Sequence, residues 1–200
     1  MNENLTPKES LEIISGMIKN RKTRLKSNGF MILFWGWLVI AAAIGQIILM
    51  LLELYSICWT PWLLTLAGGV FAIFYGRSCK EKRSEQSHLD VISGTVWLLF
   101  ALNAMILGFV FLPLVLGIKY MGIVLILLGI ASVTEGVVSQ FRPSVIGGII
   151  SNVLGFVNLL LFFFLKDDPM LWIYTFVLLI LGIFVTNIIP GYIIRRRYYE

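Results

Sequence analysis

The chain has 200 residues, of which 58% are apolar and only 14% are charged. Soluble domains carry about 25% charged residues, so this composition excludes an ordinary water-soluble domain and favours the bilayer as the solvent. The formal net charge of +5 is spread unevenly along the chain. We relate that unevenness to membrane orientation, and we expect no nucleic-acid partner.

The first 28 residues form a polar arm that we expect to be a cytoplasmic amphipathic helix followed by a basic linker. Thr6-Pro7-Lys8-Glu9 has the pattern of a capping box with proline at the first helical position. Apolar residues then recur at helical spacing, and basic residues fill the other positions. The residues that define this arm are Leu11, Ile14, Ile18, Arg21, Lys22, Arg24 and Lys26.

Two roles for the arm remain open at this level. In the first role, the helix lies on an anionic inner leaflet or docks on the protein's own cytoplasmic loops. Binding to the leaflet is favoured because each basic residue near the surface contributes about 1 kcal/mol of attraction. In the second role, the helix binds a specific cytoplasmic protein. The bilayer and a cytoplasmic protein are therefore the two expected partners, and formation of an oligomer is compatible with either.

Six apolar segments follow the arm, and each approaches the length of about 20 residues that a spanning helix needs. Their ranges are 30–52, 59–76, 91–112, 118–138, 145–165 and 170–194. The sequence thus predicts an all-α membrane protein, with a domain at 29–194 made of three antiparallel hairpins. Residues 195–200 form a basic cytoplasmic tail.

Lys and Arg are distributed unequally between the two predicted sides of this bundle. Of the 16 Lys and Arg residues, only Lys119 and Lys166 fall in loops on one side. The others lie in the arm, the second and fourth loops and the tail. Because cytoplasmic loops are enriched in Lys and Arg, we expect both termini in the cytoplasm and the chain in a bacterial inner membrane as a multi-pass protein.

Small residues recur every seven positions in several of the segments. They are Gly29, Gly36 and Ala43; Gly69 and Gly76; Gly122, Gly129 and Gly136; and Gly148 and Gly155. Lipid tails are as apolar as leucine, so helices in a bilayer associate through close backbone contact, which small residues permit. We interpret these stripes as packing surfaces, with a glycine-lined substrate path as the alternative.

A few polar residues interrupt the apolar segments. The candidates for a functional role are Glu135, Gln46, Asn103, Asn158 and Asn187. Ionisable groups inside a span are costly to bury and often functional, and Glu135 is the only acid among the five. Two roles of Glu135 therefore remain open. It can interact with water or a cation at the inner boundary, where Arg142 lies nearby, or it can bind a proton or a substrate. The amides are expected to bond between helices.

The first 45 residues resemble a known group of proteins. Three groups of residues carry the likeness: Glu9-Ser10-Leu11 with Ile14, Met17 and Ile18; Gly29; and Phe34-Trp35-Gly36-Trp37. Together they are similar to a family of small bacterial multi-span inner-membrane proteins, mostly without an assigned function. The resemblance implies an inner-membrane location and brings no catalytic residues.

Motifs for enzyme chemistry are absent from the sequence. The single histidine, His88, lies in a polar loop and cannot form a metal site by itself, because such sites need three or four ligands. No phosphate-binding loop, dinucleotide motif or zinc-protease motif occurs, so we expect no catalytic residues, cofactor or metal. The leading hypothesis is a non-catalytic membrane module that anchors, senses for or regulates a cytoplasmic or membrane partner. The alternative is a small transporter or channel for an unidentified solute.

Overall fold

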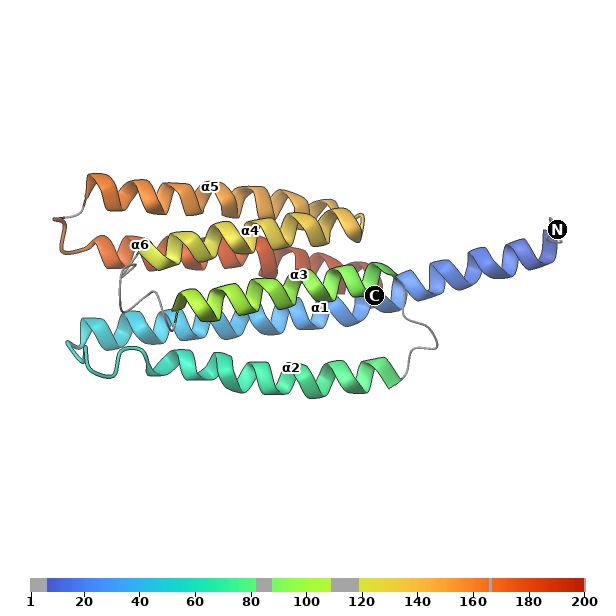
Figure 1. The fold of residues 1–200 in the computed structure, drawn as a ribbon, viewed down its shortest axis with the longest axis horizontal. Coiled ribbons are helices and arrows are strands. Elements are labelled where there is room, and N and C mark those ends of the chain that lie inside the picture. The colour runs from blue at the N-terminus through green and yellow to red at the C-terminus, as the bar shows by residue number, and fades with distance from the viewer. Residues whose placement is uncertain (1–6, 82–87, 109–118, 166, 200) are drawn as a thin grey trace.

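The computed structural model describes residues 7–81, 88–108, 119–165 and 167–199, with side chains from residue 29 onward except 79–90, 198 and 199. This part of the chain is helical and contains no strand (Figure 1). The helices, with a 3-10 turn η1 and a π-helical segment η4, are α1 (Pro7–Leu51), η1 (Thr60–Trp62), α2 (Leu63–Glu81), α3 (His88–Ile106), α4 (Tyr120–Val138), α5 (Arg142–Phe164), α6 (Leu171–Ile183), η4 (Phe184–Ile188) and α7 (Ile189–Tyr199).

Helices occupy all six predicted segments, but among the described residues four stretches are both long and apolar enough to cross a bilayer. These are Gly29–Leu51, Tyr120–Val138, Arg142–Phe164 and Leu171–Arg197. The apolar part of α3, Val91–Ile106, is shorter, and the predicted end of its segment at 109–112 lies outside the described residues. Helix α2 ends in the charged residues Arg77, Lys80 and Glu81, which shorten its apolar length.

Helix α1 is one continuous helix of 45 residues. At 1.5 Å per residue it is about 68 Å long, more than twice the roughly 30 Å hydrocarbon core of a bilayer. The predicted linker before residue 29 is therefore helical, and the arm and the first apolar segment form one element. Figure 1 shows the N-terminal part of α1 extending beyond the ends of all the other helices.

The helices lie side by side along the long axis of the molecule (Figure 1). Helix α1 contacts α2, α6, η4 and α7, while α4 contacts α3, α5 and α6. The α4–α5 turn, the end of α2, the start of α3 and the C-terminal end of α7 all lie at the end from which α1 projects. The predicted tail is mostly part of α7, which continues to Tyr199.

The most extensive helix contact joins α4 to α5. A Cβ atom on Gly148 would lie only 2.7 Å from the carbonyl oxygen of Gly129, and one on Gly155 only 2.8 Å from that of Gly122. Added Cβ atoms would approach α5 to 3.0 Å or less at each of the three α4 glycines, Gly122, Gly129 and Gly136. The packing interpretation of these two stripes is thus confirmed.

The same interpretation is wrong for α2. In the part of the chain that the structure describes, neither Gly69 nor Gly76 has an atom within 4 Å of an added Cβ. The glycine that meets another helix is Gly68, where an added Cβ would lie 2.6 Å from Cδ1 of Leu38 in α1. Neighbouring residues on a helix point about 100° apart, so seven-residue spacing alone did not identify the face that α2 turns toward α1.

The core lies where α1, α4 and α6 meet. Its buried members are Ile40, Ala43, Met121, Leu125, Leu128, Phe176, Leu179, Ile183 and Ile188. Helix α5 buries small and polar residues instead, namely Ser144, Gly147, Gly148, Ser151, Gly155 and Asn158. Its outward face is apolar and exposed, with Ile146, Ile149, Val153, Phe156, Leu160 and Phe163.

We expect Gly148→Ala to destabilise the protein, because the three atoms nearest the new Cβ, which are the carbonyl oxygen of Gly129 and the Cγ2 and backbone nitrogen of Val133, all lie under 3.0 Å away. Overpacking of this kind costs about 1–3 kcal/mol. The matched control is Gly69→Ala, which meets open space and should be neutral or stabilising by about 0.5–1 kcal/mol. Thermal unfolding in mild detergent measures both, and equal midpoints for the two variants would contradict the role given to the α4–α5 contact.

Candidate functional site

The contact between α1 and the last helix lies where the arm leaves the bundle. A Cβ atom on Gly29 would lie 2.5 Å from Cγ2 of Ile194, and one on Gly191 would lie 2.5 Å from Cγ of Leu33. About two turns along α1 from Gly29, a Cβ on Gly36 would lie 2.8 Å from Cβ of Asn187. We call this contact the α1–α7 seam. Glycines on both sides bring the helices close enough for the seam to fix the direction in which the arm projects.

The π-helical segment η4 lies at the inner end of this seam. In it the N–H of Ile189 donates to the carbonyl of Phe184, five residues earlier. Pro190 follows directly and is fully buried. Proline has no N–H, and its ring clashes with the carbonyl four residues earlier, here that of Thr186. The wider π turn relieves that clash, and such turns occur frequently at functional sites.

Two buried polar residues of η4 are held by hydrogen bonds. The hydroxyl of Thr186 lies 2.8 Å from the carbonyl oxygen of Gly182 and 2.8 Å from Oδ1 of Asn187. The amide Nδ2 of Asn187 donates across the seam to the carbonyl of Ile32 at 3.3 Å. Asn187, a candidate from the sequence, therefore joins η4 to α1 by a side-chain hydrogen bond.

Glu135, another residue predicted from the sequence, also has a hydrogen-bond partner on another helix. Its side chain is only 5% exposed, and the hydroxyl of Ser93 in α3 donates to its Oε2. The hydroxyl of Ser139 donates to the backbone carbonyl of Glu135 at 2.6 Å. Ser93 was missed in the sequence, because it is 42 residues away along the chain and one serine in an apolar helix carries no signal.

The remaining predicted polar residues are spread through the bundle. Gln46 accepts a hydrogen bond from the indole N–H of Trp62, and Asn158 donates to the carbonyl of Thr175 at 3.2 Å. Asn103 is exposed and donates to the carbonyl of Leu99 in its own helix, so it does not join two helices as expected. The five candidates therefore do not form one polar site.

The predicted arm residues all lie on the helical backbone of α1. They are Leu11, Ile14, Ile18, Arg21, Lys22, Arg24 and Lys26. Their side chains are outside the part of the chain that the structure describes. What the backbone adds is that all of them belong to the same continuous helix as the first apolar segment.

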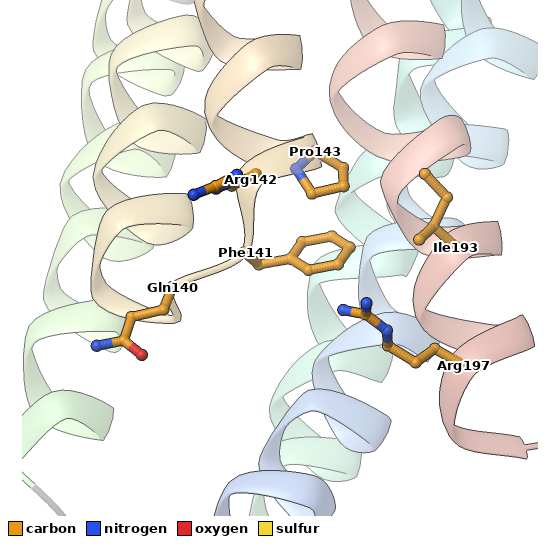
Figure 2. Close-up of a pocket in the computed structure, with 6 residues that line it drawn as sticks. All are labelled: Gln140, Phe141, Arg142, Pro143, Ile193 and Arg197. Atoms are coloured by element: carbon orange, nitrogen blue, oxygen red, sulfur yellow. The ribbon is translucent and has the colours of Figure 1, made fainter.

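A cavity of about 380 Å³ lies between the α4–α5 turn and α7. Its lining consists of Gln140, Phe141, Arg142, Pro143, Ile193 and Arg197 (Figure 2). Arg197 reaches from α7 toward the ring of Phe141, whereas Arg142 leaves the start of α5 on the other side of the backbone. The sequence placed both arginines on one side of the membrane but did not bring the turn and α7 together.

We expect Ser93→Ala to lower the free energy of unfolding by about 1–3 kcal/mol, because it removes a donor from a buried carboxyl group. The matched control is Thr95→Ala on the same helix. Thr95 is exposed and bonds only to the carbonyl of Val91 in its own helix. The free energy of unfolding of both variants is measured in detergent. A loss for Ser93→Ala no larger than that for Thr95→Ala would contradict a structural role of the Ser93–Glu135 hydrogen bond.

Comparison of the chain with protein-family models, with curated proteins and with solved structures gave no match. The likeness to small bacterial multi-span proteins therefore remains an expectation from the sequence. Arguments about function depend on the residues and contacts described above.

Proposed function

We propose that the protein is integral to a bacterial inner membrane, with six spans in three antiparallel hairpins. The support comes from α5, which buries small and polar residues and exposes large apolar ones. In water this arrangement would be unfavourable, because the large apolar side chains of the exposed face would remain in contact with water. In lipid it is favourable, since small residues let helices approach while apolar side chains contact the tails.

The same proposal places both termini in the cytoplasm. The arm, the α4–α5 turn and the end of α7 share one end of the molecule, and these elements hold most of the Lys and Arg residues. The positive-inside rule assigns that end to the cytoplasm. Lys119, at the start of α4, belongs to the opposite end and lies 4.4 Å from the centre of the Phe162 ring.

The two native cysteines test this topology. Cys58 lies in the connection between α1 and α2, and Cys79 lies near the end of α2. We expect a membrane-impermeant maleimide added to intact cells or right-side-out vesicles to label the Cys79→Ser variant, which keeps Cys58. The Cys58→Ser variant should be labelled only after permeabilisation, and the reverse pattern would overturn the orientation.

Within the membrane we propose a non-catalytic module that anchors or regulates a cytoplasmic partner through the arm. The observation that carries this proposal is the continuity of α1. Residues 7–28 continue the first span as a helix of 22 residues, about 33 Å long at 1.5 Å per residue. A continuous helix transmits a displacement or a rotation along its axis, whereas a flexible linker would absorb it.

The α1–α7 seam supplies the connection between this arm and the bundle. Gly29 and Gly36 bring α1 against Ile194 and Asn187, and the Asn187 amide bonds to the carbonyl of Ile32. A force on the arm is therefore received by α7 and η4, and also by α2, whose Tyr75 ring lies 5.2 Å from the ring of Phe30. A partner bound to the arm and a change in the bundle can influence each other by this route.

We expect a stoichiometric partner to be recovered when the full chain is purified from native membranes in mild detergent. Deletion of residues 1–27 should abolish that recovery. Ser27→Pro should reduce it to the same level, because an interior proline breaks or kinks a helix at a cost of about 3 kcal/mol, while Ser27→Ala should leave it unchanged.

Two outcomes would contradict this proposal. Recovery that survives the deletion contradicts the role of the arm. Recovery that survives Ser27→Pro but not the deletion contradicts a rigid connection and leaves a flexible tether. The thermal midpoint of each purified variant shows whether the transmembrane bundle itself is intact.

A second function, a small transporter, is favoured by one observation. Glu135 is a buried acid whose carboxyl oxygen accepts a hydrogen bond from Ser93 on another helix. An ionisable group inside a span can serve a proton relay. If no partner is recovered with the full chain, flux assays in vesicles that compare Glu135→Gln with the natural chain become the deciding measurement.

A further inference from the structure

We infer that the cavity between the α4–α5 turn and α7 binds the phosphate of an acidic phospholipid headgroup. The inference rests on the proposed membrane insertion and is independent of the partner of the arm. The cavity measures about 380 Å³, which is within the range of about 300–1,000 Å³ that small-molecule sites occupy.

The charge of the lining points to an anion. Two of the six lining residues, Arg142 and Arg197, carry a positive charge, and none of the six is acidic. Guanidinium groups bind phosphate through paired N–H donors, which makes arginine the preferred residue for such sites. The start of α5, whose first residue is Arg142, adds the positive end of a helix dipole beside the cavity.

The other lining residues favour a lipid over a free anion. Phe141, Pro143 and Ile193 give the cavity an apolar wall, which suits the glycerol and acyl carbons below a headgroup. Ile193 is also 38% exposed on the outside of α7, so the wall continues onto the surface that we assign to lipid. Basic pockets between helices on the cytoplasmic side are typical sites for acidic headgroups.

The two arginines have different places at this site. The guanidinium of Arg197 points toward the ring of Phe141, inside the cavity, whereas Arg142 points away from Arg197 (Figure 2). Phe141 itself is only 4% exposed and forms a fixed floor. Arg197 is therefore the contact to the phosphate, whereas the guanidinium of Arg142, on the other side of the turn backbone, adds positive charge at a greater distance.

The test is lipid retention by the full chain, purified in a neutral detergent and followed by native mass spectrometry. The probes are dioleoyl phosphatidylglycerol, dioleoyl phosphatidylcholine and inorganic phosphate. We expect the natural chain to retain phosphatidylglycerol over phosphatidylcholine. Arg197→Gln should weaken retention of phosphatidylglycerol about tenfold, because a hydrogen bond to a charged group is lost and a tenfold change in affinity corresponds to about 1.4 kcal/mol.

The matched control is Arg195→Gln. It removes the same charge from the same helix, but Arg195 does not line the cavity and lies about 200° away around the helix. We expect its retention of phosphatidylglycerol to equal that of the natural chain. Arg142→Gln should give a smaller loss than Arg197→Gln and provides a second variant if the first does not fold, as judged by its thermal midpoint.

Two results would overturn the inference. Equal losses for Arg195→Gln and Arg197→Gln would mean that net charge, and not this cavity, attracts the lipid. Displacement of phosphatidylglycerol by inorganic phosphate at comparable concentration would mean that the cavity takes a free anion and that the acyl chains add nothing. Neither result bears on whether the arm binds a protein partner.

Discussion

The close backbone contact between α4 and α5 is the constraint on which the arrangement of the other helices depends. Gly148 faces the carbonyl of Gly129, and Gly155 faces that of Gly122. Because these glycines have no side chains, the two helices approach closely along most of their length. The side of α4 that remains carries Leu125 and Leu128 into the core shared with α1 and α6. Helix α5 has no large buried apolar residue. It therefore stabilises the bundle through close backbone packing more than through buried apolar area.

A second constraint is that polar groups buried in such a bundle must find partners within it. Each unsatisfied group in an apolar solvent costs several kcal/mol. Among the described residues no buried side-chain nitrogen or oxygen lacks a hydrogen bond. The bonds of Asn158 to Thr175 and of Asn187 to Ile32 join different helices. These amides thus fix which residues of neighbouring helices lie side by side, a precision that apolar contacts alone do not give.

The proposed functions use different parts of this framework. The arm and the α1–α7 seam form one mechanical unit, because α1 is continuous and its glycines pack on α7. The cavity near Arg197 lies on a neighbouring face of α7, beside the α4–α5 turn. Helix α7 therefore connects the arm with the proposed lipid site. Binding of an acidic lipid at the cavity would influence the arm through α7 and through η4, which contacts both α5 and α1.

The sequence alone determined the all-helical class, the places of the six apolar segments and the grouping of positive charge. These properties follow from composition and from periodicity along one chain. It also identified the α4 and α5 glycine stripes, because a repeat of seven keeps residues on one face of a helix. It did not identify Gly68 in α2, since the choice among adjacent glycines depends on where α1 lies.

Only the tertiary structure decided which polar residues meet. Ser93 joins Glu135, and Asn187 joins Ile32, across separations of 42 and 155 residues, and no local pattern encodes such pairs. The structure also showed that Asn103 faces outward and that the arm has no break before the first span. The physical reason is common to all of these: periodicity fixes the faces of each helix, whereas packing between helices decides which face meets which.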